Sequence, residues 1–228
     1  MKTLGIIGGT SYVSTAETYR TINHLFSQRA GGFEFPKMVI YSVNLGEVVR
    51  NADADRHDLN EIIMKNAANG LIAAGAEAVM FGANTMHRYI PALTLTVPIL
   101  HIADAIIPAI RANGQSKVAL LGTRLTMEET FIRSRIEDAG IECLTPETQA
   151  ERDWIQESIF LELARDIFTP ETKARYLEII EGLIARGAQG VILGCTEIPL
   201  LLKPEDVRVP TYDTGFLHAE YAVNWLRG

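Results

Sequence analysis

Two stretches of the sequence are alike: GLIAAGAEAVMFGANT at residues 70–85 and GLIARGAQGVILGCTE at residues 182–197, with eight aligned residues identical. Each stretch predicts the end of a helix, a short apolar strand, and a glycine turn into a polar helix start, where α/β proteins place ligands. The matched turn position holds Ala83 in the first copy and Cys195 in the second. We therefore expect two similar lobes that differ in one reactive group.

The repeat extends beyond these stretches. Val97-Pro98 returns as Val209-Pro210 at the same offset, and LGIIGGT at residues 4–10 is echoed by VALLGT at residues 118–123. Amphipathic helical stretches separate most of the apolar runs, a pattern that predicts parallel sheets. The predicted strands are Leu4 to Ile7, Met38 to Val43, Ala78 to Phe81, Ile99 to His101, Val118 to Leu121, Ile141 to Leu144 and Val191 to Leu193.

We expect an α/β fold of two Rossmann-like, pseudo-symmetric lobes with the active site in the cleft between them. The N-terminal lobe is predicted to contain residues 1–102 plus 211–228, and the C-terminal lobe residues 103–210. The last helix, Gly215 to Trp225, is expected to pack back on the N-terminal lobe. No Pro/Gly/Ser-rich linker separates the two.

Composition excludes several classes of protein. The chain has 228 residues, 47% of them hydrophobic and 21% charged, which is enough to bury a sizeable core. Its net charge of −7 argues against nucleic acid or an anionic membrane as the main partner. No run approaches the roughly 20 apolar residues of a membrane span, and no signal-peptide pattern follows Met1. We expect a cytoplasmic protein whose two cysteines are free thiols.

The sequence offers no cofactor motif. The glycines of the first turn do not have the G-x-G-x-x-G spacing, and no Walker loop, GxSxG elbow or zinc cluster is present. The five histidines show no metal-ligand spacing. We therefore expect neither cofactor nor metal. The glycine-rich turn at Gly9 and Thr10 suits a ligand carboxylate, although it also fits a simple tight turn.

Cys195 is the candidate reactive group. It follows a strand and a glycine and precedes a predicted helix start at Thr196-Glu197-Ile198, where the helix N-terminus is expected to lower the thiol pKa. The alternative is an inert buried cysteine. Cys143 lies inside a predicted strand, and there we favour the inert interpretation.

Taken together, several motifs resemble the aspartate/glutamate racemase family, and aspartate racemases most of all. They are GIIGGT at residues 5–10, the turn at residues 82–85 with His87 after it, VPILHI at residues 97–102, LLGT at residues 120–123 and GCTEIPLLL at residues 194–202. The resemblance implies a cofactor-independent enzyme that commonly dimerises. It also implies inversion of an α-carbon by two facing cysteines, because a racemase removes a proton from one face and returns one to the other.

By this resemblance, Cys195 is one of the two bases, and Thr196 and Glu197 hold the substrate and orient the thiol. Asn84 and Thr85 offer hydrogen bonds to the α-carboxylate, unless they only cap a helix. The expected substrate-binding set also includes Gly9, Thr10 and Thr123.

An acidic substrate needs a cation for its side-chain carboxylate. The loop NLGEVVR at residues 44–50 resembles a family loop in which the arginine binds that group, so Arg50 is the first candidate. Arg165 stands at a position that is usually lysine in the family, and arginine could bind the carboxylate with two hydrogen bonds. Both could instead be surface charges. The expected ligand is aspartate or glutamate.

Ala83 departs from the family pattern, because a methyl group can neither take nor give a proton. Three interpretations stay open: a deliberate replacement of cysteine that inactivates the enzyme, a natural one-base racemase that uses water, or a one-cysteine decarboxylase of the same superfamily. A non-catalytic binding protein for acidic amino acids is a further alternative.

Overall fold

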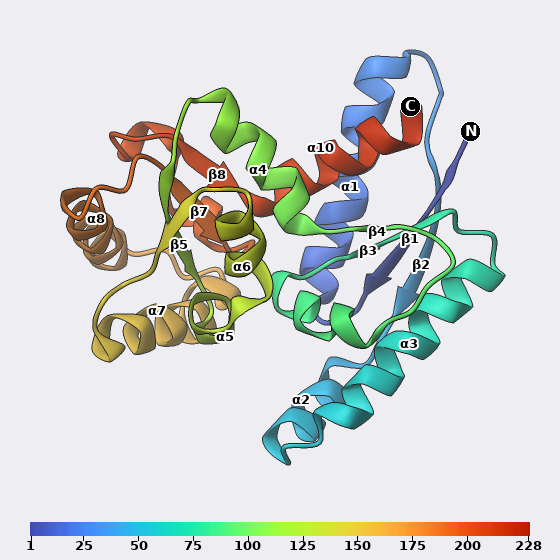
Figure 1. Cartoon of the computed structure of the whole chain (residues 1–228), viewed down its shortest axis with the longest axis horizontal. Coiled ribbons are helices and arrows are strands. Elements are labelled where there is room, and N and C mark those ends of the chain that lie inside the picture. The colour runs from blue at the N-terminus through green and yellow to red at the C-terminus, as the bar shows by residue number, and fades with distance from the viewer. The chain divides into compact units, whose positions relative to one another are not determined.

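The computed structural model describes residues 1–228, which form two compact units. The first unit contains Met1–Ile102 and Gly215–Gly228, and the second contains Ala103–Thr214. Each unit is built on a four-stranded parallel sheet with helices on its faces (Figure 1). The predicted α/β fold with two similar lobes is confirmed.

The sheet of the first unit has the strand order β2-β1-β3-β4. Its strands are β1 (Thr3–Gly8), β2 (Lys37–Ser42), β3 (Ala78–Phe81) and β4 (Ile99–Leu100). Its helices are α1 (Tyr12–Ala30), α2 (Leu45–Asp53), α3 (His57–Ala73), the 3-10 helix η1 (Asn84–Ala92) and α10 (Thr214–Arg227). Leu4 packs with residues of α1 and α10, whereas Ile7 packs with residues of α3, so each face of the sheet has its own apolar cluster.

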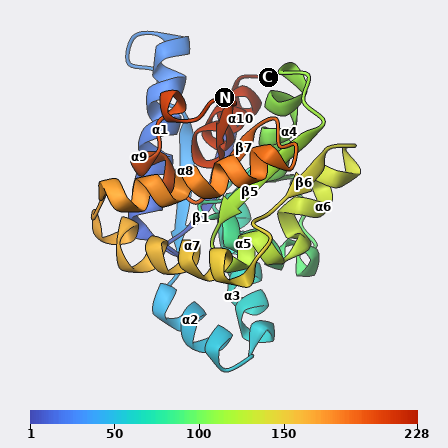
Figure 2. The same ribbon diagram turned by 90° about the vertical axis from the view of Figure 1, so that its left-hand side faces the viewer.

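The second unit repeats this topology with the order β6-β5-β7-β8. Its strands are β5 (Lys117–Gly122), β6 (Glu142–Leu144), β7 (Val191–Gly194) and β8 (Thr211–Asp213). Its helices are α4 (Ile102–Ala112), α5 (Arg124–Glu128), α6 (Thr130–Asp138), α7 (Gln149–Leu161), η2 (Leu163–Arg165), α8 (Pro170–Ala185), α9 (Ile198–Leu201) and η3 (Pro204–Asp206). Figure 2 shows α7 and α8 side by side in front of this sheet, and both contribute to the main core cluster of the unit.

Local sequence explains where the helices begin. The Ser11 side chain accepts a hydrogen bond from the Ser14 N–H at the start of α1, and Thr148 and Glu151 form a capping box on α7. Pro170 occupies the first turn of α8, where its missing N–H costs nothing. The central strands are apolar throughout because helices cover both faces of a parallel sheet.

Two strand-end turns require glycine for steric reasons. Gly9 has a φ of +88°, and a Cβ atom there would lie 2.2 Å from the Val43 carbonyl oxygen. A Cβ at Gly194 would lie 2.6 Å from the Leu121 carbonyl oxygen. Both glycines therefore let the chain turn close against a neighbouring strand.

The structure corrects one predicted boundary. The sequence predicts that residues 211–228 belong to the first lobe, but β8 pairs with β7, so the chain stays in the second unit through Thr214. The repeat contained this information, since Val97-Pro98 precedes β4 as Val209-Pro210 precedes β8. A three-residue strand is too short to be recognised from its own composition.

Both cysteines are free thiols, as predicted. None of the helices has the length and apolar character needed to cross a membrane.

Candidate active site

The candidate residues of the second unit follow two neighbouring strands. Gly122 of β5 lies beside Gly194 of β7, so Thr123 and Cys195 leave adjacent strand ends at the carboxyl edge of the sheet. This edge is where parallel α/β sheets bind ligands. The structure thus brings Thr123, Cys195, Thr196 and Glu197 together on one edge.

Cys195 has a carboxylate as its immediate partner. Its thiol donates a hydrogen bond to Glu197 Oε2 at an Sγ–O distance of 2.8 Å, and the Thr196 hydroxyl donates to the same oxygen at 2.8 Å. All three residues are partly buried. Glu197 can therefore orient the thiol and receive its proton.

The predicted direction of the Cys195 pKa shift is wrong. Burial, followed by the charge of Glu197 and its hydrogen bond, raises the pKa of the Cys195 thiol well above its ordinary value. The sequence suggested a helix start at Thr196, but α9 begins at Ile198 and contains only four residues. So short a helix offers little dipole to offset burial beside a carboxylate. Cys195 is accordingly held as a protonated thiol.

Cys143 differs from Cys195 in its place in the sheet and in having no carboxylate hydrogen-bonded to it. It lies in β6, is buried, and burial raises the pKa of its thiol to about 12. No side chain within hydrogen-bonding distance can take its proton. The inert interpretation of this cysteine suits its position inside the strand.

Thr123 caps α5, because its hydroxyl oxygen accepts a hydrogen bond from the Thr126 N–H at 3.4 Å. The next residue, Arg124, is held by α7, because its N–H donates a hydrogen bond to the side chain of Gln156 at 2.8 Å. The turn that carries Thr123 is thereby tied to α7.

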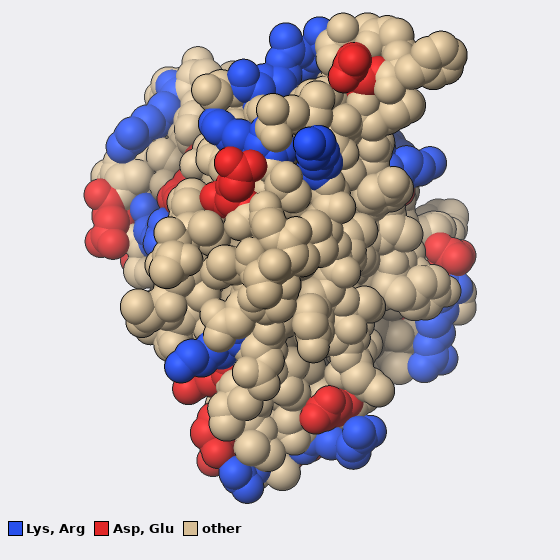
Figure 3. All heavy atoms as spheres, turned by 90° about the vertical axis from the view of Figure 1, so that its right-hand side faces the viewer, with Lys and Arg blue, Asp and Glu red and all other residues tan.

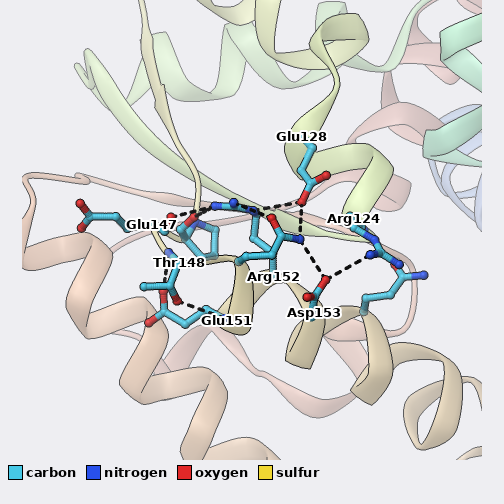
Figure 4. Close-up of polar contacts among 10 residues, drawn as sticks. Arg124, Glu128, Glu147, Thr148, Glu151, Arg152 and Asp153 are labelled. Atoms are coloured by element: carbon cyan, nitrogen blue, oxygen red, sulfur yellow. Dashed lines mark hydrogen bonds and ion pairs between the residues drawn. The ribbon is translucent and has the colours of Figure 1, made fainter.

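A polar network extends this connection (Figure 4). Arg124 donates to Asp153 at 3.2 Å, and Arg152 donates to Glu128 at 3.1 Å, so each helix supplies one cation and one carboxylate. Gln149 bridges the two pairs by donating to Glu128 and to Asp153. The network holds α5 in place against α7, and with it the strand end beside Cys195.

Arg165 ends η2, a segment that contacts α9. Leu163 of η2 and Ile198 of α9 belong to the core cluster against which Cys195 packs. The Arg165 guanidinium is exposed and takes part in none of the ion pairs of the chain. A guanidinium without an internal partner is free to bind a carboxylate.

The first unit presents the matching turn. Ala83 is partly buried, and the preceding Gly82 carbonyl accepts a hydrogen bond from the Ser14 hydroxyl at 2.6 Å. The Gly9 N–H donates to Thr15 Oγ1 at 2.9 Å, so this amide is already used inside the unit. Asn84 is buried at the start of η1, whereas Thr10 and Thr85 are partly exposed.

Arg50 lies on α2 of the first unit. Asn44, six residues earlier, caps that helix by accepting a hydrogen bond from the Glu47 N–H at 3.3 Å. The Arg50 side chain is exposed and, like that of Arg165, joins no ion pair. Each unit thus contains one of the two candidate arginines, Arg50 in the first and Arg165 in the second.

Sequence reasoning missed one cluster. His87, His101 and His218 are separated in the chain but meet in the first unit, where all three are buried. Their ring centroids lie 4.7 Å (His87 to His101) and 5.7 Å (His87 to His218) apart. Only the fold brings them together, so spacing along the chain could not reveal them. No group of three or more His, Cys, Asp or Glu side chains is arranged to hold a metal ion.

Comparison with known proteins shows the family to which the chain belongs. The sequence model described as Asp/Glu/Hydantoin racemase matches residues 7–222. The chain belongs to this racemase family. The match includes both turns and nearly all of both units.

Solved structures from the family are closely similar. A putative Asp/Glu racemase from Yersinia pestis shares 38% sequence identity and a TM-score of 0.95, with all of both chains covered. An aspartate racemase homologue from Pyrococcus horikoshii shares 34% identity and a TM-score of 0.85, again over all of both chains. A glutamate racemase from Deinococcus radiodurans is 27% identical over 172 residues, which are 72% of this chain and 56% of that protein.

Proposed function

We propose that the protein acts on the α-carbon of aspartate or glutamate as a racemase-type isomerase, with Cys195 as its proton-transfer group and without a cofactor. The hydrogen bond from the Cys195 thiol to Glu197 is the observation that carries this proposal. It joins a reactive hydrogen to a carboxylate acceptor at a strand end, in a chain of the racemase family.

The proton balance of the step is simple. Glu197 takes the Cys195 proton, and the resulting thiolate takes the α-hydrogen while the C–H electron pair passes into the α-carboxylate as an enediolate. Return of a proton from Cys195 restores the same enantiomer. Inversion requires a proton from the opposite face.

Ala83 stands, in this proposal, where the family has its other cysteine. The support is the repeat, in which positions 83 and 195 match and both follow a strand-end glycine. A methyl group returns no proton, so net racemisation by the chain as written is slow. The interpretation of Ala83 as a deliberate replacement explains why the motifs on both sides of it are intact.

The acidic substrate class is supported by Arg50 and Arg165. Both guanidinium groups are exposed, and neither is neutralised by a carboxylate of the chain. A hydrogen bond to a charged group is worth about 1.5–3 kcal/mol, enough to favour a dicarboxylic amino acid over alanine. One extra methylene distinguishes aspartate from glutamate by only about 1–3 kcal/mol.

The protonated state of Cys195 also favours a second candidate, decarboxylation of a malonate-type substrate. There the C–C bond breaks, CO₂ leaves, the electron pair enters an enediolate, and the Cys195 thiol protonates the α-carbon from one face. This reaction uses the thiol as it stands and needs no residue at position 83. Release of CO₂ from a malonate, without α-hydrogen exchange in aspartate, would identify the protein as a decarboxylase.

The deciding experiment is incubation with each enantiomer of aspartate and of glutamate in D₂O, followed by proton NMR of the α-position. A single thiol on one face is expected to exchange the α-hydrogen of one enantiomer much faster than that of the other. Calorimetric binding without exchange would identify an amino-acid-binding protein instead. Equal exchange of both enantiomers would contradict the one-sided arrangement.

We also propose that the chain forms a homodimer through the edge strand β2. This strand has no partner on its outer side, and exposed apolar side chains gather on it and on the segments beside it: Phe33, Phe35, Ile40, Tyr41, Leu45 and Val49. Figure 3 faces the side on which β1, β2 and α3 are labelled in Figure 1, and few charged side chains lie in its middle. An uncovered apolar edge suits a second identical edge.

Light scattering after size exclusion tests the dimer. Ile40→Lys is expected to shift the protein towards the monomer, because it buries a charge in the proposed contact. Leu125→Lys is the matched control, since Leu125 is 40% exposed and Ile40 39% exposed, but Leu125 lies in the second unit. Equal behaviour of the two variants would contradict an interface at β2.

A further inference from the structure

The histidine cluster of the first unit contacts the turn that carries Ala83, through hydrogen bonds of His87 to the carbonyls of Ala83 and Asn84. His87 sits in the first turns of η1, His101 follows β4, and His218 is on α10, where its Nε2–H donates to the Leu100 carbonyl at 2.7 Å. The two points at which the chain passes between the units are Ile102 to Ala103 and Thr214 to Gly215. His101 and His218 are therefore close in sequence to the two crossings.

The contacts of His87 define its protonation. The Ile102 N–H donates to His87 Nε2 at 3.2 Å, so that nitrogen carries no proton. The proton is on Nδ1, which donates to the carbonyl oxygens of Asn84 at 3.0 Å and of Ala83 at 3.2 Å. Only the neutral Nδ1–H form satisfies all three contacts. Burial, with the neighbouring His101 and His218, lowers the pKa of His87 well below its ordinary value and so favours this form.

We propose that His87 is the positioning residue of the Ala83 turn: its Nδ1–H holds the carbonyls of Ala83 and Asn84, and with them the direction of the Asn84 and Thr85 side chains. The Ile102 N–H, at the point where the chain leaves the first unit, fixes the ring tautomer that makes Nδ1 the donor. The inference rests on the proposed function insofar as this turn binds the α-carboxylate of the substrate.

Packing alone would make a different prediction. His87 also contacts Phe81, with ring centroids 5.4 Å apart, so any smaller side chain lowers the stability of the unit. A residue that only fills space would, however, leave the turn and its ligand unaffected in the folded fraction. Two amide variants separate these roles, because each keeps one half of the imidazole hydrogen bonding.

The experiment compares His87→Asn with His87→Gln. The asparagine amide reaches the position of Nδ1 and can donate to the Ala83 and Asn84 carbonyls, whereas the glutamine amide reaches the position of Nε2 and can accept from Ile102. Hydrogen exchange measured by mass spectrometry is expected to rise in the segment at residues 83–87 in His87→Gln and to stay near the parent level in His87→Asn. Aspartate affinity by calorimetry is expected to fall about two- to tenfold in His87→Gln alone, the value of one neutral hydrogen bond.

The outcomes are distinguishable. Equal exchange in the two variants, with thermal unfolding lowered to the same extent, would overturn the positioning role. Absence of aspartate and glutamate binding to the parent would overturn the proposed function, while the difference in exchange would still test His87. If neither variant folds, NMR of the unmodified protein decides: the His87 Nδ1–H resonance is expected to shift when aspartate is added, and an unchanged resonance at saturation would overturn the inference.

Discussion

The turn at Ala83 and the turn at Cys195 occupy the same place in two copies of one topology but carry different chemistry. The turn after β7 holds a thiol hydrogen-bonded to Glu197, and only four helical residues follow it. The turn after β3 holds a methyl group, and His87 of the nine-residue η1 donates a hydrogen bond to the Asn84 carbonyl of that turn. The two copies thus share the strand order and the glycine before the turn, while single side chains decide what each copy can do.

Ala83→Cys should produce the largest change in activity, because a cysteine at position 83 would make the two turns chemically alike. Racemisation of aspartate is expected to rise by roughly two to four orders of magnitude, the usual contribution of a positioned proton donor. Chiral chromatography of the product measures it. Ala83→Ser is the matched control, since a hydroxyl of similar size is a far poorer base. No gain in the cysteine variant would mean that position 83 is not the missing proton donor.

Removing the thiol from the other turn should erase the remaining activity. Cys195→Ser is expected to lower α-hydrogen exchange in D₂O by roughly two orders of magnitude or more. Cys143→Ser should leave the exchange rate unchanged, because Cys143 is buried in β6 with its pKa raised to about 12. Similar losses in both variants would point to damage to the second unit rather than to loss of a catalytic group.

Acid should lower the free energy of unfolding of the first unit more than that of the second, because residues 103–214 contain no histidine. Burial lowers the pKa of His218 from 6.5 to about 4, so the unfolded state binds the proton more readily. The stability held by neutral His218 is therefore present above pH 6.5 and is lost as the pH falls through about 4. For a shift of this size the loss is on the order of 3 kcal/mol.

Chemical denaturation between these pH values measures the effect. His218→Asn should flatten the pH dependence of the free energy of unfolding, whatever its stability at neutral pH. His24→Asn, on the exposed side of α1, should keep the parent slope. The same slope in all three proteins would show that buried His218 does not control acid unfolding.

Glu197→Gln should change the pKa of the Cys195 thiol, because it replaces the carboxylate beside the thiol by a neutral amide. The charge of Glu197 and its hydrogen bond both raise the pKa of Cys195. The neutral amide is therefore expected to lower that pKa, and the thiolate should form at lower pH. Ultraviolet absorbance of the thiolate during a pH titration, in a Cys143→Ser background, measures the change. A thiolate that forms at an unchanged or higher pH would show that burial alone controls Cys195.

Much of the architecture was predictable because it depends on local patterns. Apolar runs broken by glycine turns located β3 and β7, and the paired segments indicated two units with one topology. The strand β8 was missed, because three residues give no periodic signal and the pairing with β7 is a tertiary contact.

The sequence by itself determined the two strand-end turns and the difference between Ala83 and Cys195. These features follow from residue order and from local patterns that act over a few residues. Only the tertiary structure decided the state of the thiol and the meeting of the histidines. The pKa of Cys195 depends on burial and on the position of the Glu197 carboxylate, and His87, His101 and His218 meet only when α10 packs on the first sheet. Desolvation and charge act through space, so their effect is fixed by folding rather than by distance along the chain.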